Sequence, residues 1–154
     1  MEKPIYKAEE LLENINKLTN DARAAKIPVI YIQHINNSNL MEGTEGHEIH
    51  PELKPQKEAL LYKKTVSSMF EETDMHQELQ REGIEKLVLT GLLTNACVKN
   101  NCIAAKKLGY KVFLVEDAHS CRGEKAKQTI ERCNKQLVND GIVELVATKE
   151  VNFK

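Results

Sequence analysis

Short, continuously apolar runs alternate with helical patterns along most of this chain, and this alternation constrains the fold more than any other feature. The clearest pair is KLVLTGL at 86–92 and KVFLVEDA at 111–118, separated by a helical pattern at 96–108 that Gly109 closes. Strands that are apolar throughout, rather than at every second residue, are buried on both faces. Because helices separate them, such strands pair in parallel. The sequence therefore predicts an α/β fold, a three-layer α/β/α arrangement around a mostly parallel sheet.

The other predicted elements continue this alternation. Apolar residues that recur every three or four positions predict helices, and short β-branched runs predict strands. The segment at 35–58 is rich in Gly, Asn and Pro and has no periodicity, which predicts a long loop of the kind that often carries function. With no repeat and no linker, residues 1–154 are predicted to form a single domain. The remaining predictions are a helix from Leu11 to Ala25 that Pro28 ends, strands at 29–34 and 59–63, a helix at 74–83 capped by Thr73 and stopped by Gly83, a helix at 124–139 and a last strand at 142–147.

Composition argues against two classes of partner. The 22 basic and 23 acidic side chains leave a formal net charge of -1, and only 5% of the residues are aromatic, so neither electrostatic capture of nucleic acid nor base stacking is indicated. No apolar run approaches the roughly 20 residues that cross a bilayer. The first residues, MEKPIYKAEELLENI, have spaced rather than continuous apolar positions and do not resemble a signal peptide. We therefore expect a cytoplasmic protein that binds neither nucleic acid nor membranes.

The four cysteines do not form a metal-binding pattern. They lack a CxxC pair and the histidine spacing of a zinc module, and in a reducing cytoplasm they are expected to be free thiols. Cys102 and Cys133 lie on apolar helix faces and are predicted to be packing residues. The five histidines are scattered along the chain, and no metal is expected.

Cys97 has a position that the other cysteines lack. It follows a strand and a tight turn, at the start of a helix, where backbone N–H groups and the helix dipole favour an anion such as a thiolate. The same N–H groups could hold the oxyanion of an acyl intermediate. Ligands of open α/β sheets bind beyond the carboxyl ends of the strands, where Lys63, Lys64, His34 and the segment 117–119 are also predicted to lie. Taken alone, a lysine pair is usually a solvated surface feature.

The sequence resembles the isochorismatase-like cysteine hydrolases, a superfamily that includes nicotinamidases and N-carbamoylsarcosine amidase. The likeness rests on TGLLTNACV at 90–98 followed by AAKKLGYKVFLVEDAHS at 104–120, and on KKTVSSMFEETDM at 63–75, which resembles the lysine motif of the family. VIYIQH and GTEGHEIHPEL resemble its second strand and the following loop. The resemblance runs over nearly the whole chain, and the cysteine and lysine segments together are specific.

The resemblance implies roles for individual residues. Cys97 matches the nucleophile of the family, and Lys64 matches its catalytic lysine better than Lys63 does. The family places a cis peptide before the cysteine, which corresponds to Leu92-Leu93, and the N–H groups of Leu93 and Cys97 would form the oxyanion hole. Leu92, Leu93 and His34 are accordingly predicted at the oxyanion or substrate site. The implied protein is a cofactor-free homo-oligomer that hydrolyses a small amide, carbamoyl or isochorismate-like substrate.

The chain departs from the family pattern in its first residues. The family opens with an apolar strand that ends in the Asp of a Cys-Asp-Lys triad, and this strand lies in mid-sheet beside the VIYIQH strand. MEKPIYKAEELL contains neither an apolar run nor a strand-end Asp, which predicts a gap in the sheet and a missing base. Glu45, Glu48 and Asp117 are other acidic residues, but no motif transfers the role to them.

Three explanations of this departure remain open: a start codon assigned too late, a degraded gene copy, or a non-catalytic relic that keeps the pocket. The Asp-x-His metal motif of nicotinamidases is not recognisable after His34, so that activity is disfavoured. The alternative to a hydrolase is a pseudoenzyme or an oligomer-forming subunit that binds a small molecule.

Overall fold

The structure, a computed structural model, describes residues 5–34, 60–64, 70 and 74–153. Its elements alternate as the sequence predicts. In chain order they are α1 (Ala8–Ala24), β1 (Ile30–His34), β2 (Leu60–Lys64), α2 (Met75–Arg81), β3 (Lys86–Leu92), the π-helical turn η2 (Thr94–Val98), α3 (Lys99–Lys107), β4 (Lys111–Ser120), α4 (Ala126–Asn139), β5 (Glu144–Val146) and the 3-10 turn η3 (Thr148–Glu150).

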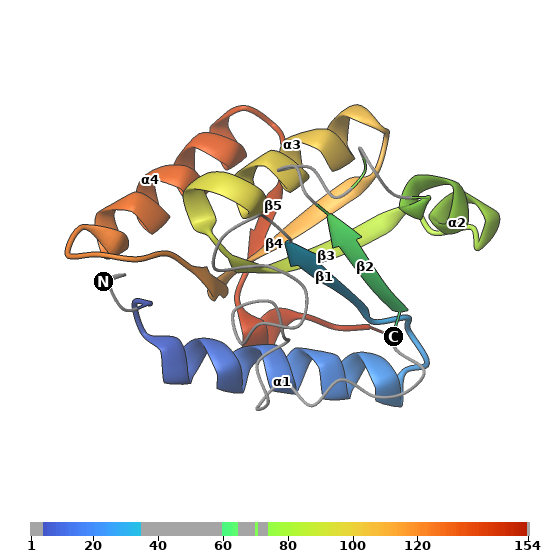
Figure 1. The fold of residues 1–154 in the computed structure, drawn as a ribbon, viewed down its shortest axis with the longest axis horizontal. Helices are drawn as coiled ribbons and strands as arrows, with labels where there is room; N and C mark the ends of the chain where they lie inside the picture. The colour runs from blue at the N-terminus through green and yellow to red at the C-terminus, as the bar shows by residue number, and fades with distance from the viewer. Residues whose placement is uncertain (1–4, 35–59, 65–69, 71–73, 154) are drawn as a thin grey trace.

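The helices cover both faces of the strands, which confirms the predicted α/β fold with a parallel sheet flanked by helices (Figure 1). Helix α1 packs on one face, where Leu11, Ile15 and Leu18 meet Val115 and Ala118 of β4. On the other face, α3 and α4 lie over β4. Burial of one apolar stripe per helix against the strands is the main stabilising contribution in this architecture.

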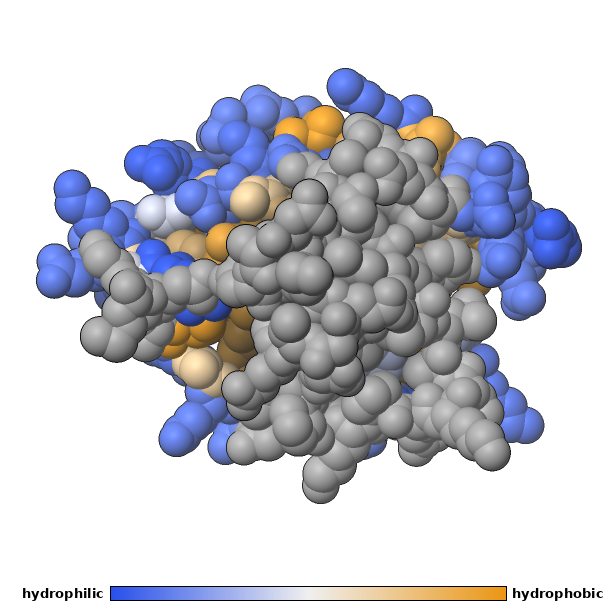
Figure 2. Space-filling model, viewed as in Figure 1, coloured by the Kyte–Doolittle hydropathy of each residue, from blue (hydrophilic) through white to orange (hydrophobic). Residues whose placement is uncertain are grey.

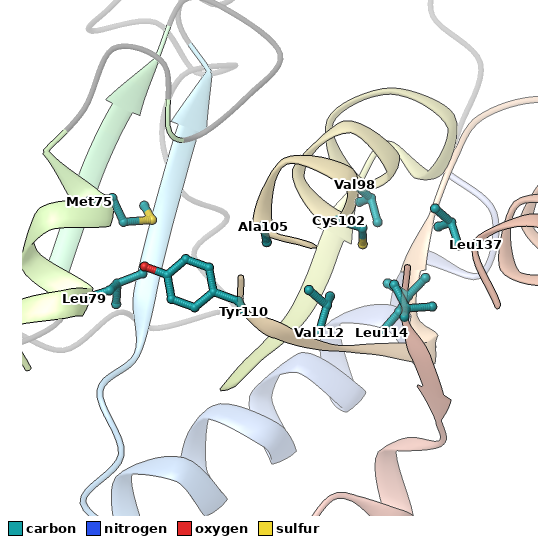
Figure 3. Packing of buried hydrophobic residues seen from close by; sticks show 10 residues of the cluster. Met75, Leu79, Val98, Cys102, Ala105, Tyr110, Val112, Leu114 and Leu137 are labelled. Atoms are coloured by element: carbon teal, nitrogen blue, oxygen red, sulfur yellow. The ribbon is translucent and has the colours of Figure 1, made fainter. Parts of the chain in front are cut away.

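The larger core lies under α2, α3 and α4 (Figure 3). Cys102 of α3 and Val98 of η2 lie beside Val112 and Leu114 of β4, and all four are buried. Cys102 has no exposed surface, as predicted for a packing residue. Because η2 and α3 are anchored by this core, the turn that carries Cys97 sits on a well-packed support.

The described strands form two separate parallel sheets rather than one. Strand β1 pairs with β2, with Ile30 opposite Leu60 and His34 opposite Lys64, whereas β3, β4 and β5 form the second sheet in that order. Among the described residues, no strand pairing joins the two sheets, so the break falls between β1 and β3. The resemblance predicts a gap in the sheet, and the described strands show one.

Several predicted boundaries are wrong, and each has a local reason. Strand β4 continues past residue 118 to Ser120, because Gly91 and Leu92 of β3 extend the ladder opposite His119 and Ser120. The predicted helix at 96–108 begins instead as the π-helical turn at Thr94, and α1 ends at Ala24, before Pro28. The residue that precedes α2 is Asp74 rather than the predicted Thr73, and its side chain makes no capping hydrogen bond. The last strand, predicted at 142–147, is confined to Glu144–Val146.

On the face that Figure 2 shows, the visible side chains of the described residues are mainly hydrophilic, with some apolar ones among them. Leu92, at the end of β3 and immediately before the cysteine turn, is 43% exposed. No helix among the described residues is both long enough and apolar enough to span a bilayer. The predicted loop at 35–58 and Thr73 lie outside the described residues.

Candidate active site

Cys97 lies in the π-helical turn η2, which links the carboxyl end of β3 to α3. The turn is closed by the Leu93 carbonyl, which accepts hydrogen bonds from the backbone N–H groups of Ala96 and Val98, each at 3.1 Å. Gly91 enters the turn at φ 120°, a backbone conformation that side chains with a Cβ rarely adopt. The peptide between Leu92 and Leu93 is cis, as predicted from the resemblance.

Cys97 is partly exposed, whereas the other three cysteines are buried. Burial raises the pKa of Cys102 to about 12, and it also raises the pKa of Cys121, where the neighbouring Cys133 adds to the effect and a hydrogen bond with Thr94 opposes it. Buried thiols of this kind are poor nucleophiles because they ionise reluctantly. Of the four cysteines, Cys97 is therefore the one placed to meet a substrate.

A buried polar network lies directly beside the cysteine turn. The hydroxyl of Thr94, the first residue of η2, is 2.7 Å from Nδ1 of His119 in β4. Nε2 of His119 is 2.8 Å from Oδ1 of Asn134 in α4. All three side chains are more than 90% buried, so their polar atoms depend on one another rather than on water. The network connects η2, β4 and α4 through side chains alone.

The pKa of His119 is lowered from its usual value because burial disfavours the charged ring. The hydrogen bond with Asn134 and the negative charge of Asp117 oppose this shift. The ring is therefore neutral at physiological pH.

The stability of the fold is expected to decrease as the pH falls below about 6.5, the unfolded-state pKa of histidine. Below that pH the unfolded chain binds a proton that the folded His119 resists, so folding loses up to about 1.4 kcal/mol per pH unit until the folded pKa is reached. Urea unfolding of the wild type and His119→Gln between pH 7.5 and 5 measures this effect. In His119→Gln the free energy of unfolding should depend less on pH than in the wild type. An equal dependence in both proteins would contradict the lowered pKa of His119.

The lysine and histidine that the sequence predicts at the site lie in the two-stranded sheet of β1 and β2. His34 and Lys64 are the last residues of β1 and β2 and lie opposite each other in the parallel register. The structure therefore brings their backbones together at the carboxyl end of this sheet. The side chains of His34, Lys63 and Lys64 lie outside the described part of the chain, and their approach to Cys97 stays a prediction.

The segment 117–119 forms the last part of β4, which ends at Ser120, so it lies at the carboxyl end of this strand. The carboxylate of Asp117 accepts hydrogen bonds from the backbone N–H of Thr148 at 2.8 Å and from its hydroxyl at 2.7 Å. Asp117 thus anchors η3. Glu45 and Glu48 lie outside the described residues. Among the residues that are described, no three histidine, cysteine or carboxylate side chains gather as a potential metal site.

Thr94 and Asn134 were not predicted as site residues. Thr94 stands three residues before Cys97 in TNACV, and this spacing is the one sequence signal that could have identified it. Asn134 interrupts the apolar face of α4 between Cys133 and Leu137, but its partner His119 is 15 residues away in the sequence. Contacts across such separations cannot be predicted from local patterns.

Comparison with known proteins places these features in a family. An uncharacterized isochorismatase family protein, YddQ of Bacillus subtilis, is 35% identical over 115 residues, which cover 71% of this chain and 63% of that protein. The ureidoacrylate amidohydrolase RutB of Agrobacterium fabrum is 30% identical over 142 residues, covering 72% of this chain and 62% of the relative. The chain thus spans less than two thirds of these curated relatives.

Solved structures show the same fold. The isochorismatase-like hydrolase from Alkaliphilus metalliredigens superposes with a TM-score of 0.82 at 26% identity, over 92% of this chain and 82% of the other. Residues 1–139 also match the model of the isochorismatase domain. Together with the parallel strands, the flanking helices and the cysteine turn after β3, these matches show that the chain belongs to the isochorismatase family.

Proposed function

We propose that this chain is a cysteine-dependent hydrolase of a small amide or carbamoyl compound, with Cys97 as the nucleophile. The observation that carries the proposal is the contrast among the cysteines. Cys97 is partly exposed in the turn between β3 and α3, whereas Cys102, Cys121 and Cys133 are buried. The ureidoacrylate amidohydrolase among the relatives supports an amide or carbamoyl substrate. An isochorismate-like vinyl ether is a further candidate that the sequence resemblance includes.

The proposed reaction proceeds through a thioester. The Cys97 thiolate attacks the carbonyl carbon and forms a C–S bond, and the backbone N–H groups of Leu93 and Cys97 hold the negative charge on the oxygen. The C–N bond then breaks, and the departing nitrogen takes up the proton that the thiol lost. Water cleaves the thioester, releasing the acid and restoring the thiol. The ammonium of Lys64 is assigned to favour the thiolate.

A second candidate is a non-catalytic subunit that keeps the fold and binds a small molecule without turning it over. The lack of any pairing between the β1–β2 and β3–β4–β5 sheets among the described residues favours this alternative, because the resemblance implies a strand ending in the catalytic Asp at this place. A panel of primary amides, N-carbamoyl amino acids, ureidoacrylate and isochorismate distinguishes the two candidates. Release of ammonia or acid supports the hydrolase, whereas binding without product supports the subunit.

Selective labelling of Cys97 is the direct test of its proposed role. At pH 7, iodoacetamide is expected to alkylate Cys97 at least about tenfold faster than Cys102 or Cys133, because only an accessible thiolate reacts quickly. Peptide mass spectrometry at successive times gives the individual rates. Equal, slow labelling of all three cysteines would remove the reason for assigning Cys97 as nucleophile.

A further inference from the structure

We propose that His119 is a positioning residue, which fixes the cysteine turn by holding the Thr94 hydroxyl. The inference rests on the proposed role of Cys97 and extends it to residues that do not touch the substrate. His119 belongs to the segment 117–119, which the sequence singles out and which the proposed reaction does not use.

The hydrogen-bond partners determine the tautomer of the His119 ring. Oδ1 of Asn134 can only accept a hydrogen bond, so Nε2 of His119 must carry a proton and donate it. Because the ring is neutral, Nδ1 has no proton and accepts a hydrogen bond from the Thr94 hydroxyl at 2.7 Å. The Thr94 hydroxyl therefore donates its one proton to His119, and its oxygen is left to accept from its other partner, the Cys121 thiol.

His119 also contacts the turn a second time, through its backbone. It lies opposite Gly91 in the β3–β4 register, while its side chain binds Thr94. One residue of β4 therefore holds both flanks of the Leu92-Leu93 peptide. The Cys97 thiol lies three residues beyond Thr94 in the same π-helical turn. A change in the orientation of Thr94 would move the N–H groups of the turn relative to the sulfur.

A histidine that merely satisfies its hydrogen bonds in a core would stabilise the fold without affecting the reactivity of Cys97. The two roles differ in one measurable quantity, the alkylation rate of Cys97 in the folded protein. If the network orients the turn, its loss displaces the turn relative to the sulfur and slows the alkylation of Cys97, whereas a histidine that only stabilises the core leaves this rate unchanged.

The test compares Thr94→Val, which keeps the branched shape and removes the hydroxyl, with Thr94→Ser, which keeps the hydroxyl. Iodoacetamide labelling at pH 7 is expected to slow about tenfold at Cys97 in Thr94→Val and to stay within about twofold of the wild type in Thr94→Ser. Slow labelling of Cys102 in each protein shows that the core has stayed closed.

A second variant acts from a different element. Asn134→Leu, in α4, removes the group that accepts the Nε2 proton of His119. This variant is expected to slow the alkylation of Cys97 at pH 7 as Thr94→Val does. The test therefore does not depend on one substitution folding. Both variants could instead have lower melting temperatures and the wild-type alkylation rate at Cys97. This result would overturn the positioning role of His119 but not the proposed role of Cys97 as nucleophile.

The opposite failure is also distinguishable. If Cys97 of the wild type reacts no faster than Cys102, the proposed function fails, and the positioning role is then judged by amide hydrogen exchange. The N–H groups of Ala96 and Val98 bind the Leu93 carbonyl and report the order of the turn. Faster exchange of these two amides in Thr94→Val supports the positioning role, whereas unchanged exchange overturns it.

Discussion

Replacing Cys97 by alanine is expected to lower kcat/KM at least about a thousandfold for whichever small amide or carbamoyl compound the chain hydrolyses, because the proposed covalent intermediate forms on its sulfur. The three remaining thiols cannot substitute for it. Cys102, Cys121 and Cys133 are buried, and the pKa of Cys102 is raised to about 12. The substrate panel proposed above, followed by ammonia or acid release, measures the loss.

The matched control is Cys133→Ala, which removes a buried thiol from α4, where alanine is the best helix former. It is expected to change stability slightly and to keep the activity of the wild type. Cys97→Ala should retain the melting temperature of the wild type, because the residue lies partly exposed and outside the hydrophobic core. Equal activity of Cys97→Ala and the wild type would eliminate the cysteine mechanism.

Adding an apolar strand that ends in Asp ahead of Met1 is expected to raise kcat/KM by about a hundredfold to ten-thousandfold, the usual contribution of a positioned general base. The reason lies in the break between the two sheets. Strands β1 and β3 do not pair with each other, and a parallel strand between them would connect β2-β1 to β3-β4-β5 in one sheet. Its carboxyl end would then lie beside the ends of β1 and β3, near the turn that carries Cys97.

The control for this fusion carries the same strand with Asn in place of the final Asp. Both fusions are expected to raise the melting temperature, because each joins the sheets by backbone hydrogen bonds and buries apolar surface. Only the Asp fusion should gain the full activity. Equal activity of the two fusions would mean that the added carboxylate takes no part in the reaction and that joining the sheets alone accounts for the gain.

Local sequence patterns are sufficient to predict the elements whose apolar residues have a clear spacing. The run at 86–92 was predicted with the bounds that β3 has in the structure, because apolar residues fill it and polar residues and Gly83 precede it. The buried stripe of α1, from Leu11 to Ala22, follows directly from its spacing of three and four. Cys97 could be singled out because its turn combines a strand end, a glycine and a helix start within seven residues.

The sequence by itself determined that this chain is an α/β protein of parallel strands and flanking helices with a cysteine at a strand-to-helix turn, because periodicity and apolar runs are local properties of the chain. Only the tertiary structure decided which buried groups support that cysteine. The bond between Thr94 and His119 spans 25 residues, and β4 reaches Ser120 only because β3 lies beside it. The break between β1 and β3 is likewise a property of pairing, which depends on neighbours that are distant along the chain.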